Sequence, residues 1–257
     1  MTVSNSAPTR EWFRDWFGEE YLALYPHRDE REAREAVDLF RDVGSRIPGS
    51  RILDVACGAG RHLRELRAAG LDATGLDLSL PLLRSARSTA PADPLVRGDM
   101  RRLPFARGVF GGLTSFFTSF GYFADPVDDR RVLQEMARVL APGGAFMIDF
   151  LNASRVREEL VAEDSREVEG NRIVQVREIA DGVVVKRIRI EPFDGSPIRY
   201  FEERVRLYSC EKLVSLLAEA GLLTQHRFGE YSGAPFRTES PRLILAGQLD
   251  VADEETS

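Results

Sequence analysis

Three carboxylates and two glycines stand at or near the ends of short apolar runs. Asp54 precedes Gly58 and Gly60, and Asp77 and Asp99 each close a later apolar run. Glycines let the backbone pass close beneath a ligand and adopt conformations closed to other residues. An acidic residue about twenty positions after such a loop can accept both hydroxyl groups of a ribose. The spacing therefore predicts a site for a cofactor that contains a nucleoside.

The glycine loop lacks the third glycine of the dinucleotide fingerprint. That fingerprint, G-x-G-x-x-G, lets the following helix approach a pyrophosphate. The loop here reads GAGRHL, so Leu63 stands where the third glycine belongs. After the third apolar run, the carboxylate of Asp99 and the backbone N–H of Met100 can meet the amino group and ring nitrogen on the edge of adenine. These features favour an adenosine ligand without a pyrophosphate.

Alternating strands and helices place these residues at one edge of a sheet. Short apolar runs separated by helical patterns are typical of parallel β-α-β units, whose ligands bind at the carboxyl ends of the strands. The predicted fold is α/β: a doubly wound, Rossmann-like sheet of seven strands, mostly parallel. Its expected strands are 51–56, 73–78, 94–99, 108–116, 145–151, 223–231 and 242–249, and its helices end near 69, 88, 140 and 220. A turn at 142–144 leads into the fifth strand.

Three consecutive strand-like runs interrupt this alternation at 171–179, 182–192 and 198–208. Apolar and charged residues alternate in them, which predicts an antiparallel insert with one covered and one wet face. The expected organisation is an N-terminal helical cover at 1–47, a core at 48–152 and 208–250, the insert at 153–207, and a disordered tail at 251–257.

The three strand ends together resemble those of the class I S-adenosylmethionine-dependent methyltransferases. The resemblance runs from 51 to 150, and the helix–strand–strand at 209–249 matches the end of that fold. Ala56 departs from the pattern, because many members carry glycine there. The resemblance implies S-adenosyl-L-methionine as cofactor and in-line methyl transfer to a small-molecule acceptor on N, O or C. The insert is similar to substrate-covering or dimer-forming sheets of small-molecule enzymes, including some sugar N-methyltransferases.

The resemblance also implies a role for each matching position. Asp54 and the backbone of Ala56, Cys57 and Gly58 would hold the methionine amino group, and Gly60 completes the loop; Asp77 would bind ribose, Leu78 adenine, Asp99 and Met100 the adenine edge, and Phe116 and Phe117 the methionine and sulfonium. Simpler interpretations stay open. Asp54 could accept loop N–H bonds, Asp77 and Asp99 could be turn or cap residues, Met100 could only pack, and Cys57 could be inert.

Aromatic residues are concentrated before the core and after the fourth strand. Trp12, Trp16, Phe17, Tyr21 and Tyr25 have the spacing of one side of a short helix. They could form a lid in which Tyr25 or Tyr21 faces the cationic sulfonium, or they could pin this helix onto the sheet. An amphipathic helix over 30–45, capped by Asp29, follows them. The aromatic loop at 115–123 predicts a pocket for a flat or apolar acceptor.

No catalytic base is assigned. Methyl transfer from a sulfonium depends mostly on proximity and alignment, and a base is needed only where the nucleophile carries a titratable proton. Position in the chain favours Tyr122 and Asp149 over the other candidates, which are His27, His62 and Tyr231.

Bulk properties limit the remaining possibilities. The 257 residues carry a net charge of -6, which disfavours nucleic-acid binding. The basic runs at 84–87 and 97–102 are interpreted as solvent-exposed faces of helices or loops. Three scattered histidines predict no metal site. Two cysteines and the lack of a signal or membrane-spanning run predict a cytoplasmic protein. The insert could also form the interface of a homodimer. Alternatives are an NAD(P)-binding oxidoreductase, a methyltransferase acting on RNA or protein, and a catalytically silent cofactor-binding module.

Overall fold

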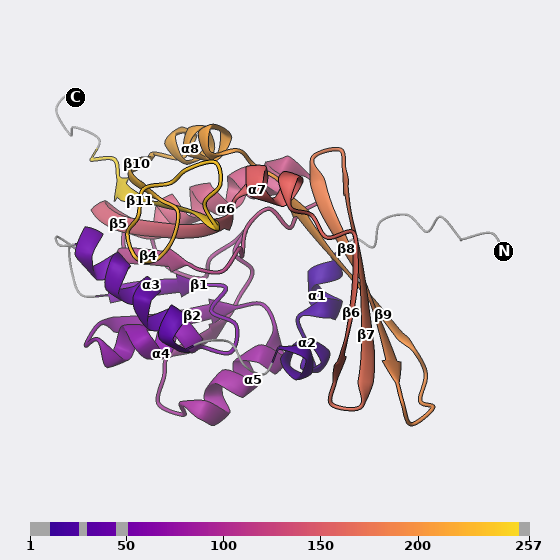
Figure 1. Ribbon diagram of the computed structural model, residues 1–257. Helices are drawn as coiled ribbons and strands as arrows, with labels where there is room; N and C mark the ends of the chain where they lie inside the picture. The colour runs from indigo at the N-terminus through magenta and orange to yellow at the C-terminus, as the bar shows by residue number, and fades with distance from the viewer. Residues whose placement is uncertain (1–10, 26–29, 45–50, 252–257) are drawn as a thin grey trace.

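A computed structural model describes residues 11–25, 30–44 and 51–251, and in them a seven-stranded sheet forms the core (Figure 1). The strand order is β10-β11-β5-β4-β1-β2-β3. Strand β11 alone runs opposite to the other six strands, which are parallel to one another. The predicted fold class is confirmed. The strands are β1 (Arg51–Val55), β2 (Asp72–Asp77), β3 (Leu95–Arg97), β4 (Phe110–Ser115), β5 (Leu140–Leu151), β10 (Leu222–Phe228) and β11 (Arg242–Leu249).

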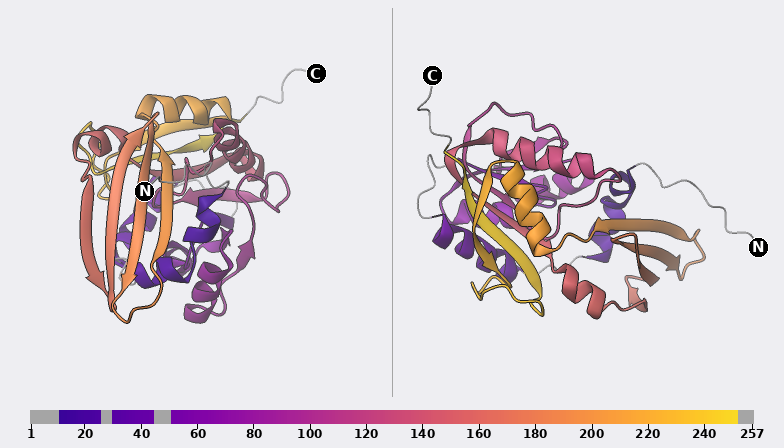
Figure 2. Two further views of the ribbon diagram at one scale, coloured as in Figure 1. Left: turned by 90° about the vertical axis from the view of Figure 1, so that its right-hand side faces the viewer. Right: turned by 90° about the horizontal axis from the view of Figure 1, so that it is seen from above.

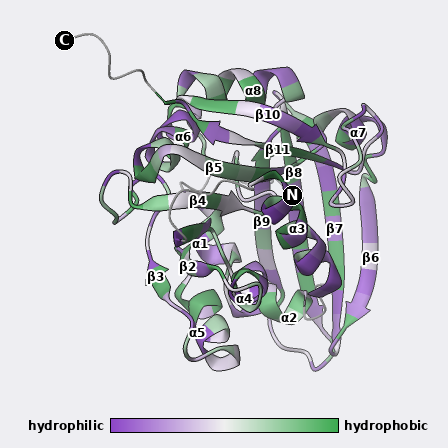
Figure 3. Ribbon diagram, turned by 90° about the vertical axis from the view of Figure 1, so that its left-hand side faces the viewer, coloured by the Kyte–Doolittle hydropathy of each residue, from purple (hydrophilic) through white to green (hydrophobic). Residues whose placement is uncertain are grey.

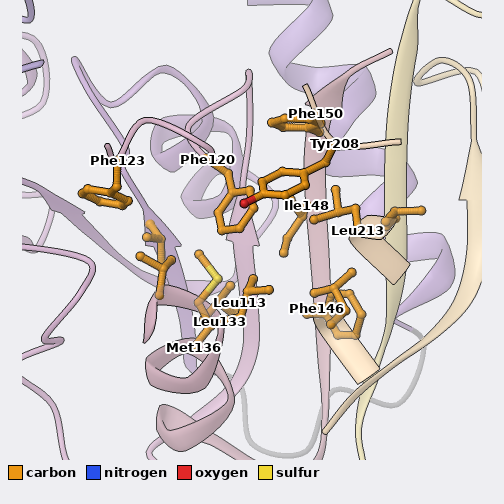
Figure 4. Close-up of a cluster of buried hydrophobic side chains, with 14 of the residues drawn as sticks. Leu113, Phe120, Phe123, Leu133, Met136, Phe146, Ile148, Phe150, Tyr208 and Leu213 are labelled. Atoms are coloured by element: carbon orange, nitrogen blue, oxygen red, sulfur yellow. The ribbon is translucent and has the colours of Figure 1, made fainter. Parts of the chain in front are cut away.

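Helices cover both faces of this sheet. Side chains of successive strand residues point to opposite faces. Ile52 of β1 therefore belongs to the core cluster that contains residues of α3 and α4, and Leu53 belongs to the cluster that contains residues of α6 and α8. Figure 4 shows part of the second face, where Phe146 and Ile148 meet Leu133 and Leu213. The helices are α3 (Glu30–Val43), α4 (Arg61–Ala68), α5 (Leu80–Thr89), α6 (Pro126–Val139) and α8 (Cys210–Glu219). None of the described helices is long and apolar enough to cross a membrane.

The insert is a four-stranded antiparallel sheet instead of the three strands predicted. Its elements are α7 (Ala153–Glu158), β6 (Glu163–Val168), β7 (Asn171–Ala180), β8 (Val183–Pro192) and β9 (Arg199–Arg206). Strand β6 reads EDSREV, which gives no apolar alternation, and it is specified by its pairing with β7. Hydrophilic and hydrophobic residues follow one another along the strands of the insert (Figure 3), and they alternate strictly over Arg187–Glu191 of β8, as expected for a sheet covered on one side.

The N-terminal aromatics form two short helices instead of one. Helix α1 (Trp12–Trp16) and helix α2 (Glu19–Leu24) are separated at Gly18 and lie between the core and the insert (Figures 1 and 2). Trp16 is fully buried, packs on Phe201 of β9 at 5.0 Å, and donates a hydrogen bond from Nε1 to Glu203. The same segment also contacts the core, because Trp12 donates from Nε1 to the carbonyl of Tyr122 at 3.2 Å and Phe13 packs on Phe123 at 5.5 Å. The helices are therefore held by the core and by the insert, and the contact with the insert was not predicted.

Smaller predictions had mixed outcomes. Ser79 caps α5 as expected, because its hydroxyl accepts from the backbone N–H of Leu82. The turn expected at 142–144 is part of β5, which already begins at Leu140 and contains a register shift opposite β4. Asp29, proposed as a helix cap, and the tail at 252–257 lie outside the described residues.

Candidate active site

A cavity of about 590 Å³ opens at the carboxyl ends of β1 to β4. The strand order reverses between the paired strands β1 and β4, and doubly wound sheets bind ligands at such a switch point. The lining brings together all the predicted cofactor residues except Asp54 and Gly60: Tyr25, Ala56, Cys57, Gly58, Asp77, Leu78, Asp99, Met100, Phe116 and Phe117. The three strand ends thus converge on one cavity.

The loop between β1 and α4 has a left-handed backbone at three positions. Ala56, Gly58 and Gly60 have φ of 58°, 57° and 77°. Glycine tolerates this conformation, whereas an L-residue with a Cβ is strained by it. Ala56 therefore carries the strain that the glycine common at this position would avoid. The loop stays closed through the bonds that Cys57 N–H donates to Leu76 O, at 3.0 Å, and that Gly60 N–H donates to Cys57 O, at 2.9 Å.

Asp77 fastens this loop to the end of β2. Its Oδ2 accepts from the backbone N–H of Gly58 at 2.8 Å, and its Oδ1 accepts from Ser79 N–H at 2.7 Å. Burial raises the pKa of Asp77, and these bonds oppose that shift. Each carboxylate oxygen has two lone pairs and accepts one of these backbone bonds, so each oxygen retains one lone pair for a further donor. A diol facing the cavity fits that pair of acceptors.

Asp54 lies directly beneath the loop and is almost completely buried. Its Oδ1 accepts from the hydroxyl of Thr114 at 3.1 Å, and its Oδ2 has no hydrogen-bond partner in the described part of the chain. The alternative in which Asp54 accepts loop N–H bonds is not supported. Burial raises the pKa of this carboxyl to about 7, and the nearby Asp77 adds to the shift. An orphaned buried carboxylate oxygen fits a cationic amino group.

Asp99 lines the cavity and is also engaged by Arg101. The guanidinium of Arg101 contacts both carboxylate oxygens, at 2.7 Å for the shortest bond. Burial alone would raise the pKa of Asp99, but the bonds from Arg101 outweigh it and lower that pKa. Arg101 also pairs with Glu11 at 2.7 Å and Asp128 at 3.2 Å. The prediction that 97–102 is a solvated face is therefore wrong for Arg101.

A second cavity of about 700 Å³ adjoins the first, between helices α1 and α2, the turn after β4 and the insert. Its far side carries ion pairs, among them Lys186 with Glu203 at 2.5 Å. Sequence reasoning missed both residues, because charge in an alternating strand indicates solvent, whereas here they belong to the covered face. The two cavities share five aromatic residues: Phe17, Tyr21, Tyr25, Phe117 and Tyr122.

The candidate bases lie in different places. Tyr122 lines both cavities, and its hydroxyl donates to the carbonyl of Thr118. His62 lines the first cavity, with its ring stacked on Phe116 at 4.4 Å. Asp149 and Tyr231 line neither cavity of the described structure; they are buried and bonded to each other at 2.6 Å. That geometry does not suit Asp149 as a base, and His27 lies outside the described residues.

Comparison with known proteins identifies the class that this fold and site define. A family model described as a methyltransferase domain matches residues 52–144. A dTDP-3-amino-3,6-dideoxy-alpha-D-glucopyranose N,N-dimethyltransferase of Streptomyces fradiae is 30% identical over 215 residues, 81% of this chain and 84% of the relative. A dTDP-3-amino-3,4,6-trideoxy-alpha-D-glucopyranose N,N-dimethyltransferase of Streptomyces venezuelae is 36% identical over 130 residues, 50% of this chain and only 54% of the relative.

Solved structures have the same fold. A S-adenosylmethionine-dependent methyltransferase from Clostridium acetobutylicum superposes with a TM-score of 0.77 at 19% identity, covering 90% of this chain and 98% of the other. The sugar N-methyltransferase KedS8 from a Streptoalloteichus species gives 0.71 at 26% identity, covering 97% and 99%. The chain belongs to the S-adenosylmethionine-dependent methyltransferase family, whose cofactor is S-adenosyl-L-methionine. The oxidoreductase alternative is thereby excluded.

Proposed function

We propose that the first cavity binds S-adenosyl-L-methionine through the residues expected from the sequence. The orphaned oxygen of Asp54 would accept from the methionine ammonium group, and Asp77 would accept from the ribose hydroxyls. Leu78 would pack on adenine, while Asp99 and the backbone N–H of Met100 would bond to its edge. The bound cofactor supplies a methyl group on a sulfonium that is already a good leaving group.

We propose that the second cavity takes a small-molecule acceptor, which the enzyme methylates. The observation that carries this proposal is the set of aromatic residues common to both cavities, which marks the place where the cavities meet. In-line displacement requires the acceptor atom to approach the methyl carbon from the side opposite the sulfur, and two cavities that meet can hold donor and acceptor in that arrangement. The ring face of Tyr122 would favour the cationic sulfonium and exclude water. The ring centre of Tyr25 already lies 5.1 Å from the guanidinium of Arg166 and 5.8 Å from the ammonium group of Lys186, so this ring would contribute mainly by packing. Proximity and alignment then supply most of the rate enhancement.

The charge of the second cavity favours an acceptor whose methylated part is uncharged. Each cation of the cavity lining is paired with a carboxylate of the same lining: Arg155 with Glu159, Arg177 with Asp164, and Lys186 with Glu203. A neutral amine has the lone pair that methyl transfer needs, and the matching relatives are named as amino-sugar N,N-dimethyltransferases. We therefore propose an amino group as the acceptor atom.

The test combines a cofactor titration with a methyl-transfer assay. Calorimetry with S-adenosylhomocysteine should give saturable binding to the purified protein. Mass spectrometry should then detect a mass gain of one or two methyl groups on an amino-sugar nucleotide, and none on a matched sugar nucleotide with hydroxyl in place of the amine. Binding without transfer to any amine would contradict the acceptor proposal and favour a catalytically silent module. Transfer to RNA or protein would favour the remaining alternative.

We also propose roles for the three parts of the chain. The helices before 48 would cover the cofactor, the core would bind it, and residues 153–207 would cover the acceptor. A homodimer would form through the outer face of the insert, where Arg187 pairs with Glu178 and Glu202 and the ring of Tyr200 is exposed. Analytical ultracentrifugation of wild type and Arg187→Glu tests the dimer. Two free cysteines support a cytoplasmic location, which cell fractionation would check.

A further inference from the structure

The turn at 116–118 separates the two cavities with a backbone that residues other than glycine rarely adopt. Phe117 and Thr118 are consecutive and have φ of 61° and 56°. Such residues are strained, and they persist only where the surrounding structure holds them in place. Phe117 lines both cavities. Whatever holds this turn therefore determines the shape of the boundary where the two cavities meet.

Asp149 at the end of β5 holds the turn from behind. Its Oδ2 accepts from the N–H of Phe117 at 2.8 Å, and its backbone carbonyl accepts from the N–H of Thr118 at 3.0 Å. The same Oδ2 accepts from the hydroxyl of Tyr231 at 2.6 Å and from the guanidinium of Arg242 at 3.0 Å. Three donors from three segments thus converge on one fully buried oxygen.

A chain of charges extends from Asp149 to the glycine loop. Arg242 pairs with Glu32 of α3, and Glu32 pairs with Arg61, the first residue of α4, at 3.0 Å. The guanidinium groups of Arg242 and Arg61 lie 5.1 Å and 5.3 Å from the centre of the Phe117 ring. Both contacts are favourable for a cation and an aromatic ring. The cluster therefore fixes the side chain of Phe117 as well as its backbone.

We propose that Asp149, supported by Tyr231 and Arg242, is a positioning residue for methyl transfer. It fixes the strained pair at 117–118 and so sets the position of Phe117 where the two cavities meet, beside the path from the cofactor to the acceptor. All three residues act through Phe117, because in the described structure they line neither cavity. The inference rests on the proposed function and adds a device that builds the wall shared by its two cavities.

The fold contains a matched control for this cluster. On the opposite face of the sheet, the hydroxyl of Tyr208 donates to Asp129 at 2.6 Å, with the guanidinium of Arg206 at 3.5 Å. Figure 4 shows Tyr208 among the buried rings of Phe120 and Phe150. This triad repeats the chemistry of Tyr231, Asp149 and Arg242, and it also lines neither cavity. Arg206 also donates to the carbonyls of Phe123 and Ala124 at the end of the aromatic loop. Tyr208→Phe leaves these bonds and the charge pair with Asp129 in place, and it removes an equivalent hydroxyl bond that does not touch the turn at 116–118.

The experiment compares Tyr231→Phe, Asp149→Asn and Tyr208→Phe with wild type. Calorimetry measures S-adenosylhomocysteine binding, and hydrogen exchange with mass spectrometry measures protection of the amides of Phe117 and Thr118. Tyr231→Phe should weaken binding about fivefold to tenfold and accelerate exchange at the turn, and Asp149→Asn should do both more strongly. Tyr208→Phe should lower the melting temperature to a similar extent while affinity stays within about twofold of wild type.

Equal affinity and equal exchange at the turn in Tyr231→Phe and Tyr208→Phe would overturn the inference. Should Asp149→Asn fail to fold, Tyr231→Phe, which retains the charge pair with Arg242, still decides the question. A wild-type protein that fails to bind S-adenosylhomocysteine would contradict the proposed function. Hydrogen exchange at Phe117 and Thr118 would then still test the cluster, because that readout needs no ligand.

Discussion

Replacement of Asp77 by Asn tests the assignment of the cofactor cavity most directly. The carboxylate accepts one backbone N–H on each oxygen, from Gly58 at 2.8 Å and from Ser79 at 2.7 Å. Asparagine keeps one acceptor oxygen and turns its amino group toward the other N–H donor. One charge-assisted bond is therefore lost, which is worth about 1.5–3 kcal/mol. Since the substitution also removes a charge that burial disfavours, the fall in the free energy of unfolding should lie at the lower end of that range.

Cofactor affinity should fall more than stability does. A ribose bound by Asp77 would lose a second charge-assisted bond, again worth about 1.5–3 kcal/mol, so the Kd for S-adenosylhomocysteine should rise about 10-fold to 150-fold. The assay is isothermal titration, with a thermal melt to establish folding. Asp72→Asn is the control: it alters the same residue type at the opposite, exposed end of β2 and should leave Kd within about twofold of wild type.

A folded Asp77→Asn variant with the affinity of Asp72→Asn would refute the reasoning. Asp77 would then be only the residue that closes the glycine loop, and the ribose would have to bind elsewhere in the cavity. Loss of folding would not have that meaning, because the loop bonds of Gly58 and Ser79 belong to the folded protein itself.

Three further predictions concern the same region and the sheet edge. Because the pKa of Asp54 is raised to about 7, the contribution of Asp54 to the free energy of unfolding should fall as pH rises from about 4 through 7. Affinity for the ammonium group of S-adenosylhomocysteine should rise over the same window, because the carboxyl ionises, and it should level off above about 7. Titrations at several pH values should show that rise flattened in Asp54→Asn; an equally steep rise in the variant would contradict the role. Ala56→Gly removes left-handed strain of about 1–2 kcal/mol from the folded state, whereas the greater entropy of glycine in the unfolded chain costs about 0.4–1 kcal/mol of stability. Denaturant unfolding should therefore show a free energy of unfolding that is higher by about 0.5–1 kcal/mol. A lower free energy of unfolding would mean that the loop is unstrained. In Gly247→Ala the new Cβ would lie 1.9 Å from the carbonyl oxygen of Leu223, so unfolding should show a loss of about 3 kcal/mol or more, and an unchanged midpoint would contradict the close pairing of β10 with β11.

The strand ends were predictable because each is encoded locally. A short apolar run, an acid and a turn residue follow one another in the chain at Asp54, Asp77 and Asp99, and parallel pairing necessarily brings those ends to one edge of the sheet. The family resemblance added the identity of the ligand. Both were sufficient for the fold class and for the first cavity.

The acceptor side was not predictable, because it depends on contacts between segments far apart in the chain. Lys186 and Glu203 resemble solvated residues of a two-sided strand, yet they face one another across β8 and β9 beneath the N-terminal helices. Strand β6 carries almost no apolar residues and exists because β7 pairs with it. Asp149 resembles a base by position alone, and only its three donors reveal that it supports the turn at 117–118.

Arg101 links the first cavity physically to the start of helix α1, part of the proposed N-terminal cover. Its guanidinium bonds to Asp99, which would bind the adenine edge, and also to Glu11, which directly precedes α1. It also lies 4.6 Å from the ring centre of Phe123 at the end of the aromatic loop. Adenine bound at Asp99 would therefore share an acceptor with the residue that fastens the cover. With the proposed role of Asp99, cofactor binding would be coupled to the position of α1 through this one cation, and the cover would belong to the binding site as well as to the packing of the insert.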